Sequence, residues 1–477
     1  MTTGTPAHRH TGTTGTSTEK IDVRDLGGSV RKEADMRIDR LELENFKMFE
    51  NRHFDLHPKF TLFVGENGSG KTSILDALAV AMGVWLIHPP DSEVRNSRRR
   101  ILPSEIRLAA SKEGDRTQFR QGGQWTRVTA IGKLADQENI QWKRALWIGR
   151  FPNDSGADQA RKIIEAVYER DRQGEKVICP VLAYYGAGRA WLPSNKRTRR
   201  KVAPNGPARR WAAFYDCLNE RIRLPELNKW FKNEALAAVN RSGRMRPGFE
   251  VVKQAVLACV PGADGLWFDP DLDQIVLSIK GNAQPFDNLS AGQGMMLALV
   301  ADVAIKAVTQ NAFLLPPDKL GPEDEPMARL LRETPGVVLI DELDVHLHPT
   351  WQRRVATDLK RNFPNIQFVC TSHSPQVIGE ISQDEVRVLH ENSAELPPVA
   401  YVADSNWILE HVMDGRQRTE WATGVIHMVE DALEEGDLES ARVELQKLRI
   451  QVGDEEGEVA RLEGSIRNME ALADENN

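Results

Sequence analysis

A glycine-rich run between an apolar stretch and a stretch with helical periodicity has the composition of a phosphate-binding loop. Residues 65–72 read Gly-Glu-Asn-Gly-Ser-Gly-Lys-Thr, which fits the pattern G-x-x-x-x-G-K-[ST]. Glycines let backbone N–H groups turn toward phosphates, and the N-terminus of the following helix favours negative charge. Lys71 is expected to reach the β- and γ-phosphates, and Thr72 to hold Mg²⁺. We expect nucleotide contacts from Asn67, Gly68, Ser69, Gly70, Lys71, Thr72 and Ser73.

Two carboxylates follow a short apolar run in the second half of the chain. The run 337–340 has the composition of a strand buried on both faces, and Asp341 and Glu342 come directly after it. An Asp in this position can orient the Mg²⁺ shell, and the Glu beside it can act as general base on the attacking water. Both could instead be solvated residues after a strand. The phosphate loop upstream favours the catalytic interpretation.

Three further segments resemble the remaining nucleotide motifs of ABC-type ATPases. Residues 288–294 (Asn-Leu-Ser-Ala-Gly-Gln-Gly) resemble the signature loop, which in that family contacts the γ-phosphate held by the opposite subunit. Residues 343–349 resemble the D-loop, with the Leu-His-Pro extension of ATPases of the RecF and overcoming-lysogenization-defect type. Residues 371–375 resemble the switch region, in which His373 would sense the γ-phosphate. The resemblance assigns further nucleotide contacts to Ser290, Gly292, Gln293 and Asp344.

The order of these motifs is that of ABC-type head ATPases, and the resemblance covers residues 36–83 and 285–380. It implies an α/β fold with a parallel-stranded core, in which two protomers sandwich two ATP molecules. Hydrolysis would take place at a composite dimer site, with ATP and Mg²⁺ as cofactors and with Thr72 and Asp341 on the metal. His346 and His348 have the spacing of a metal pair, but the Leu-His-Pro context accounts for them as packing and turn residues.

Hydrophobic periodicity predicts the elements that carry these motifs. Residues 72–82 have helical spacing. The predicted strands are 37–43, 52–56, 60–64, 177–185, 337–340 and 367–370. The stretch 177–185 is expected to be a central strand, because it is strongly apolar throughout.

Composition divides the chain into four parts. Residues 1–35 are rich in Thr, Gly and Ser and lack the apolar region of a signal peptide, so they are expected to be a disordered leader. The ATPase head is expected from 36–90 and 241–400, interrupted by a mainly helical, basic insertion, 91–240, that adds one core strand. Residues 401–477 are expected to be helical and to end in an acidic antiparallel hairpin of two helices.

The net charge of −7 conceals an uneven distribution. From Glu430 onward there are fifteen acids and five bases, so the rest of the chain is slightly positive. Its bases cluster at Arg95, Arg98, Arg99, Arg100, Arg189, Lys196, Arg197, Arg199, Arg200, Lys201, Arg209 and Arg210. Such clusters are usually solvated surface, and the alternative is contact with DNA or RNA through the insertion.

The cysteines and the hydropathy of the chain bear on its compartment. The four cysteines are scattered without paired spacing, which favours buried thiols in a reducing cytoplasm over disulfides or a zinc site. No apolar run is expected to approach the length that spans a bilayer, so we expect no membrane partner.

The remaining features narrow the resemblance within the group. Structural-maintenance-of-chromosomes and RecN-type proteins carry long heptad segments between their motif halves, and this insertion is too short and lacks heptads. The overcoming-lysogenization-defect nucleases append a Toprim domain, and the residues after Pro375 contain no such constellation. Residues 180–189 and 403–409 resemble segments of the ATPase subunits of phage-defence systems, especially PtuA of Septu and its retron-associated relatives. This resemblance implies that the chain binds and regulates an HNH-type nuclease, as PtuA does with PtuB.

Two alternatives remain open. A RecF-like DNA-repair ATPase would use the basic clusters to grip the backbone of duplex DNA. A regulatory switch would bind ATP and hardly hydrolyse it. Glu342 argues against the switch, because a switch needs no positioned base.

Overall fold

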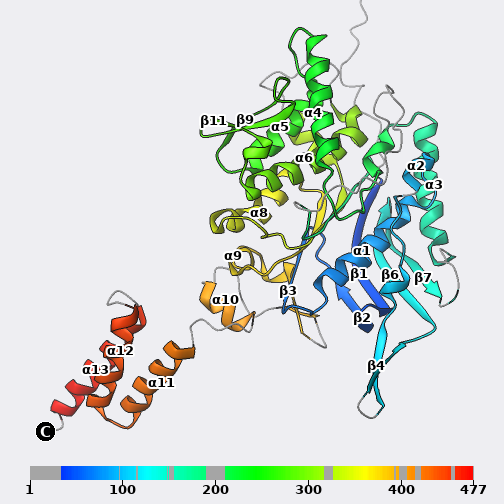
Figure 1. Cartoon of the computed structure of the whole chain (residues 1–477). Helices are drawn as coiled ribbons and strands as arrows, with labels where there is room; N and C mark the ends of the chain where they lie inside the picture. Colours follow the sequence, from blue (N-terminus) through cyan, green and yellow to red (C-terminus); the bar gives the residue numbers. More distant parts are fainter. Residues whose placement is uncertain are drawn as a thin grey trace, which may run out of the picture.

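The computed structural model describes most of the chain, as a head and a C-terminal group of helices (Figure 1). The described residues are 34–95, 97–113, 116–147, 149, 155–189, 210–315, 326–390, 394–396, 405–413, 420–452 and 457–475. Almost all of the predicted leader, the basic run 196–201 and the segment 403–404 lie outside these residues.

A six-stranded sheet in the order β15-β14-β3-β13-β12-β8 forms the centre of the head. Every neighbouring pair is parallel except β14 and β15, which confirms the predicted parallel-stranded α/β core. The strands are β3 (Phe60–Gly65), β8 (Val181–Tyr185), β12 (Gly336–Ile340), β13 (Ile366–Thr371), β14 (Val386–Leu389) and β15 (Ala394–Glu395).

Strand β8 lies at an edge of this sheet, not at its centre as predicted. Its residues are nevertheless all buried, because other backbone covers the outer side of the strand. Tyr184 N donates to Cys217 O at 2.9 Å, and Gly186 N donates to Glu220 O at 2.8 Å. The apolar run therefore reports burial correctly, but it carries no information on strand order.

Side chains on the two faces of the sheet belong to two separate hydrophobic cores. Val338 and Ile340 of β12 pack in the core that contains α5, α6 and α8, whereas Val337 and Leu339 pack in the core that contains α1. This alternation is the pattern of a strand buried on both faces. All four cysteines are free and buried, as predicted. These helices are α1 (Lys71–Met82), α5 (Pro247–Cys259), α6 (Ala291–Asn311) and α8 (Pro349–Asn362).

A second, antiparallel sheet in the order β2-β1-β6-β7 covers α1 from the other side (Figure 1). Its strands are β1 (Asp35–Phe46), β2 (Phe49–Asp55), β6 (Trp125–Ala135) and β7 (Gln137–Trp147). Residues 125–147 were predicted to belong to a mainly helical insertion, and the structure corrects this. β6 pairs with β1 along most of its length, for example Leu43 with Val128, so the strand depends on a partner about 85 residues away in the chain.

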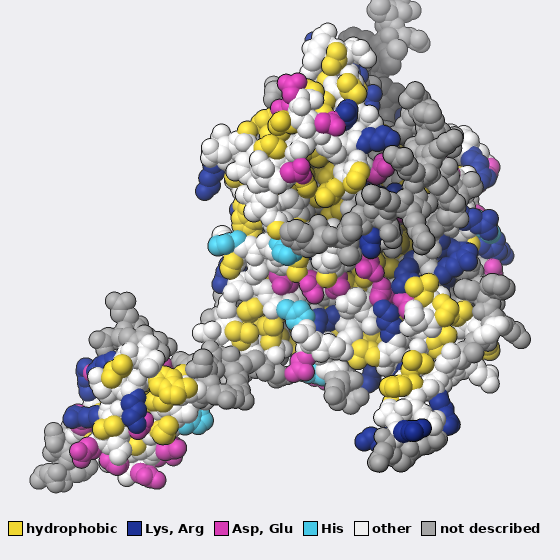
Figure 2. Space-filling model, viewed as in Figure 1, with side chains coloured by type: hydrophobic (Ala, Val, Ile, Leu, Met, Phe, Trp, Pro, Cys, Tyr) yellow, Lys and Arg dark blue, Asp and Glu magenta, His cyan; other side chains and the backbone are white. Residues whose placement is uncertain are grey.

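The other elements surround this pair of sheets. They are α2 (Ser92–Arg95), β4 (Leu108–Glu113), β5 (Arg116–Gln121), α3 (Asp158–Arg172), α4 (Leu224–Val239), β9 (Ala263–Asp269), β10 (Gln274–Ile279), β11 (Asn282–Pro285), α7 (Pro326–Glu333), α9 (Pro375–Ile378) and α10 (Ser405–His411). Strands β4 and β5 pair with each other as a hairpin that projects from the head (Figure 1). Basic side chains gather on this hairpin, where Lys112, Arg116 and Arg120 are exposed (Figure 2).

Helix α6, together with the turn that follows it, corrects the expectation that no apolar segment has the length of a membrane span. Residues 291–314 pass that test by length and composition. However, 67% of the apolar window is buried inside the protein, where α6 packs against α5 and α4. The segment is the main core helix of the described head, and this position accounts for its composition.

The C-terminal region forms three helices and not the predicted hairpin of two. The helices are α11 (Glu420–Glu434), α12 (Leu438–Val452) and α13 (Gly457–Glu475). They pack around their own core, which includes Val429, Leu445 and Leu462. The missed boundary is Gly436, whose φ of +77° ends α11, after which the Asp437 carboxylate accepts from Ser440 N at 3.0 Å and caps α12.

Candidate nucleotide site

The glycine-rich loop joins β3 to α1 in the strand–loop–helix arrangement that the sequence predicts. Gly70 has a φ of +96°, a conformation that favours glycine. A Cβ atom at this position would lie 2.5 Å from Phe49 Cζ and 2.6 Å from Met48 Sδ. Glycine is therefore required at this position for two independent reasons. One is the positive φ, and the other is the close approach of Met48 and Phe49, where β1 turns into β2.

The lysine of the loop is held beneath it. Lys71 is 7% exposed, and its Nζ donates to Gly65 O and Glu66 O, both at 2.8 Å. Burial lowers the pKa of Lys71, and the carboxylates of Asp341 and Glu342 oppose this shift. Within the described residues, the buried Ser69 Oγ has no hydrogen-bond partner. A cradle that combines a buried cation with an unsatisfied hydroxyl fits the phosphates of a nucleotide.

The two predicted metal ligands lie side by side. Thr72 Oγ1 donates to Asp341 Oδ2 at 2.9 Å, although the residues are 269 positions apart. The other carboxylate oxygen, Asp341 Oδ1, accepts from Thr371 Oγ1 at 2.6 Å. One hydroxyl and one carboxylate are the hard oxygen donors that suit Mg²⁺ bound with a nucleotide. The structure thus brings Thr72 and Asp341 together at the carboxyl edge of the sheet.

Glu342 follows Asp341 in an uncommon backbone conformation. Its φ is +48°, a value that residues other than glycine rarely adopt. Its N–H donates to Thr371 Oγ1 at 2.7 Å, so the same hydroxyl holds the Glu342 amide and the Asp341 carboxylate. Sequence analysis gave Thr371 no role of its own. Its position at the end of the strand beside β12 was the available signal.

The carboxylate of Asp344, which was predicted to contact nucleotide, binds the switch segment of its own chain. Asp344 Oδ1 accepts from Ser372 Oγ, and it also accepts from His373 N at 3.2 Å. Burial lowers the pKa of His373, the positive charge of Lys71 adds to this effect, and the nearby carboxylates oppose it. Burial and the charge of Lys71 therefore both favour the neutral form of the His373 imidazole.

The signature-like segment forms the N-terminus of α6. Ser290 Oγ accepts from Gln293 N at 3.3 Å, and Gln293 Oε1 accepts from Ser290 N at 2.9 Å, which is a capping box. A Cβ atom on Gly292 would lie 2.5 Å from His346 O, so this loop packs against the D-loop of the same chain. His348 Nδ1 accepts from Thr350 N at 3.3 Å and caps α8, the turn role expected for it.

Several residues of the basic clusters have internal partners. Arg99 bonds to Glu105, and Arg210 bonds to Asp171 and to the carbonyl of Val177. Arg189 is 3% exposed, and its guanidinium contacts the backbone next to Glu342. Arg189 is therefore buried, and Arg99 and Arg210 are half-buried and already paired, so these three arginines contribute little to an exposed basic surface. Burial of Arg189 was not visible in the sequence, where it reads as one basic residue among many.

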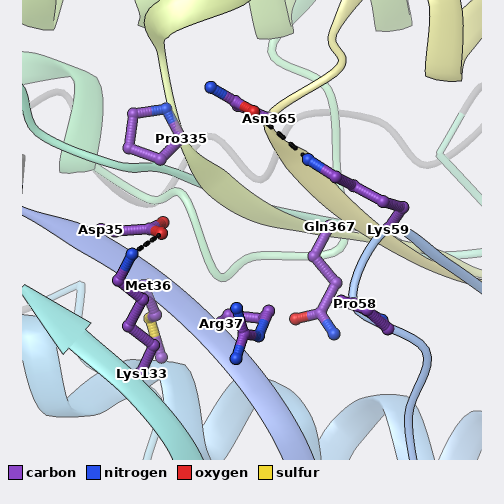
Figure 3. Close-up of a pocket in the computed structure, with 9 residues that line it drawn as sticks. All are labelled: Asp35, Met36, Arg37, Pro58, Lys59, Lys133, Pro335, Asn365 and Gln367. Atoms are coloured by element: carbon purple, nitrogen blue, oxygen red, sulfur yellow. Dashed lines mark hydrogen bonds and ion pairs between the residues drawn. The ribbon is translucent and has the colours of Figure 1, made fainter. Parts of the chain in front are cut away.

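A cavity of about 200 Å³ lies at the opposite edge of the sheet (Figure 3). It is bordered by the amino ends of β12 and β13 and by β1, whereas Lys71, Thr72, Asp341 and Glu342 follow the carboxyl ends of β3 and β12. Its charged groups have partners: Lys59 Nζ donates to Asn365 Oδ1 at 3.2 Å, and Lys133 pairs with Asp35 at 3.0 Å. The cavity is therefore separate from the nucleotide site. Lys59 and Lys133 are already paired, so they offer a ligand no free charge.

Comparisons with known proteins agree with this geometry. Residues 40–234 match the family described as "AAA domain", and residues 283–379 match "AAA domain, putative AbiEii toxin, Type IV TA system". The Retron Ec83 probable ATPase of Escherichia coli is 23% identical over 461 residues, which cover 83% of this chain and 79% of that protein. Septu protein PtuA of Bacillus mycoides is 24% identical over 366 residues, covering 74% of this chain but only 40% of that protein. These matches confirm the predicted resemblance to the ATPases of retron and Septu defence systems.

More distant similarities are also present. Proteins named DNA replication and repair protein RecF match over 9% to 22% of the chain. A solved SMC head bound to the C-terminal winged-helix domain of ScpA aligns with a TM-score of 0.44 and 15% identity, over 76% of this chain and 97% of that one.

Proposed function

We propose that this chain, an AAA-domain ATPase similar to retron and Septu ATPases, hydrolyses ATP at sites shared by two copies and thereby regulates a partner nuclease in anti-phage defence. The observation that carries the hydrolysis proposal is the bonded cluster of Thr72, Asp341 and Thr371 beside the buried Lys71. It assembles a phosphate-binding cation, two metal ligands and the strand end that presents Glu342.

The residues divide the chemistry between them. Lys71 and the loop amides would bind the β- and γ-phosphates, and Thr72 and Asp341 would hold Mg²⁺, which neutralises charge that develops on the phosphates. Glu342 would orient and deprotonate the attacking water. His373, neutral and close to Lys71, would donate a hydrogen bond to the γ-phosphate. Other nucleotide contacts are assigned to Asn67, Gly68, Ser69, Gly70, Ser73 and, from the second copy, Ser290, Gly292, Gln293 and Asp344.

Two substitutions test the chemistry. Lys71→Ala should abolish ATP binding, because it removes the one strong cation of the loop. Glu342→Gln should retain ATP binding, slow hydrolysis by about 10² to 10⁴-fold and stabilise association of two heads. Equal hydrolysis by Glu342→Gln and the wild type would refute the general-base role.

The contacts that the signature-like loop makes within its own chain support the shared site. Ser290 is exposed, and the loop packs on the D-loop side of its own chain, so its outer surface is available to a second copy. Two inactive variants, Lys71→Ala and Ser290→Arg, provide the test. In a mixed dimer one site carries both substitutions and the other carries neither. Random mixing should therefore restore about a quarter of wild-type activity. Normal hydrolysis by Ser290→Arg alone, or no recovery on mixing, would refute the shared site.

The defence role is supported by the named relatives, and its partner would be an HNH-type nuclease in the cytoplasm. Co-purification with a nuclease encoded beside the gene, retained in Glu342→Gln and lost on nucleotide depletion or in Lys71→Ala, tests this role. The RecF-like alternative predicts duplex DNA binding that weakens steeply as salt increases. A gel shift at low salt, with Arg197, Arg199 and Arg200 changed to Glu as the comparison, tests that alternative.

A further inference from the structure

The segment after β8 reaches the catalytic strand end from the side. β8 lies parallel to β12, and Asp341 N donates to Tyr185 O at 2.8 Å, so the two strand ends are joined. The chain then turns, with Arg189 N donating to Gly186 O at 3.0 Å. This turn directs the Arg189 side chain back beneath the residues that follow β12, where it is 3% exposed.

The guanidinium of Arg189 binds the carbonyls on both sides of one residue. Its Nη1 donates to Asp341 O at 2.5 Å and to Gly186 O at 3.2 Å, and its Nη2 donates to Glu342 O at 3.0 Å. Asp341 O belongs to the peptide plane before the Glu342 Cα, and Glu342 O belongs to the plane after it. The φ and ψ angles of Glu342 are the rotations of these two planes. A rigid fork bonded to both oxygens therefore restrains both angles together.

Restraint is needed at this position. The φ of +48° at Glu342 is a strained conformation for a residue with a side chain. Relaxation to a common conformation would rotate Cβ and move the carboxylate away from its present direction. The amide of Glu342 is already held by Thr371 Oγ1, and the amide of Leu343 is held by Thr371 O at 2.8 Å. Arg189 supplies the corresponding bonds on the carbonyl side.

We propose that Arg189 is a positioning residue for ATP hydrolysis, which fixes the backbone of Glu342 so that its carboxylate meets the attacking water. The inference rests on the proposed function, because it assigns Arg189 an effect only through Glu342. Nothing in it requires Arg189 to touch the nucleotide.

Arginine suits this task better than lysine does. Burial lowers the pKa of Arg189 to about 10, so the group remains protonated at neutral pH, helped by the carboxylates of Asp341 and Glu342. The planar guanidinium presents its donors in a fixed geometry that spans two neighbouring carbonyls. An ammonium is a point charge on a flexible stem and does not hold the two planes at a set angle.

The test compares Arg189→Lys with wild type for nucleotide affinity and for turnover. We expect kcat to fall about tenfold or more, while KM and the Kd for ATP stay within about threefold, because the loop and Lys71 are untouched. Arg210→Lys is the matched control, since Arg210 also binds a backbone carbonyl, that of Val177, which precedes the amino end of β8 and so lies toward the opposite edge of the sheet from Glu342. It should leave kcat within about twofold of wild type. A wild-type kcat in Arg189→Lys, or a loss confined to ATP affinity, would overturn the inference.

A double substitution separates positioning from general loss of structure. In the Glu342→Gln background, Arg189→Lys should slow hydrolysis by less than about twofold, because a residue that acts through Glu342 has nothing left to position. If the two losses multiply, Arg189 acts independently of Glu342 and the proposal fails. Should Arg189→Lys not fold, Arg189→Gln, which retains a donor amide, takes its place in the same cycle. Absence of hydrolysis in the wild type would instead refute the proposed function itself.

Discussion

The side-chain hydroxyl of Thr371 is a single atom on which two parts of the catalytic strand end depend. It donates to Asp341 Oδ1 at 2.6 Å and accepts from Glu342 N at 2.7 Å. Thr371 is fully buried and Asp341 is 4% exposed, so water cannot easily replace either bond. Thr371→Val keeps the shape of the side chain and removes only this hydroxyl. The substitution therefore measures the two hydrogen bonds without creating a large cavity.

The magnitude follows from the kinds of bond that are lost. A hydrogen bond to a charged carboxylate contributes about 1.5–3 kcal/mol, and one from a neutral amide about 0.5–1.5 kcal/mol. Thr371→Val should therefore lower the free energy of unfolding by about 2–4.5 kcal/mol. Because the same change frees the Glu342 amide, kcat should also fall by about tenfold or more, with ATP affinity less affected.

Thr371→Ser is the matched control, because it keeps the hydroxyl and loses one methyl group, which costs about 1 kcal/mol. Urea unfolding followed by circular dichroism gives the stability difference, and steady-state phosphate release gives kcat. We expect the serine variant to remain within about 1 kcal/mol and threefold of wild type. If the valine and serine variants are equal in both assays, the hydroxyl does not organise the strand end as described.

Three further predictions concern separate parts of the molecule. Gly70→Ala should abolish binding of a fluorescent ATP analogue, because the new Cβ would meet Phe49 and the φ of Gly70 is +96°. Gly424→Ala in α11 is the control and should bind the analogue normally, because no atom lies within 4 Å of its new Cβ. Burial and Lys71 lower the pKa of His373 from its usual 6.5, so the acid-side loss of kcat, measured over about pH 5 to 8, should have its midpoint below pH 6.5. A midpoint above about 6.5 that disappears in His373→Gln would contradict this. Helices α11 to α13 pack around their own core, and their acidic surface would suit a basic partner, so we propose that they dock the nuclease. Deleting residues 414–477 should then leave ATP turnover within about twofold and abolish capture of the nuclease, and unchanged capture would exclude docking through these helices. Deletion from 430 should instead cause aggregation, because it exposes the apolar face of α11.

The motif-bearing strands could be predicted because their signals are local. The apolar runs of β3, β12 and β13 are continuous, and each ends in residues that carry chemistry. Since parallel strands present their carboxyl ends at one edge, strand type alone places the residues that follow β3, β12 and β13 at the same edge of the sheet. That Thr72 and Asp341 are in contact there depends also on the strand order, which the sequence does not give.

The errors arise where the deciding partner is distant in the sequence or where one glycine decides. β6 and β7 carry lysines and arginines between apolar residues, and distant pairing makes them a sheet: β6 pairs with β1, and β7 pairs with β6. Between α11 and α12, helical spacing continues through the boundary, so periodicity alone does not reveal the left-handed turn at Gly436. The identity of Gly436 and the capping residue Asp437 was the available signal.

The site shows what a motif leaves unspecified. The motifs predict which side chains bind phosphate, metal and water, but the direction of the Glu342 carboxylate depends on backbone bonds from two neighbouring strand ends. Arg189 lies 152 positions from Asp341 and supplies the carbonyl bonds, and Thr371 lies 29 positions from Glu342 and supplies the amide bonds. Because β8 and β13 flank β12, these two residues reach Glu342 from opposite sides. The strand order of the sheet, more than any single motif, therefore determines where the catalytic carboxylate points.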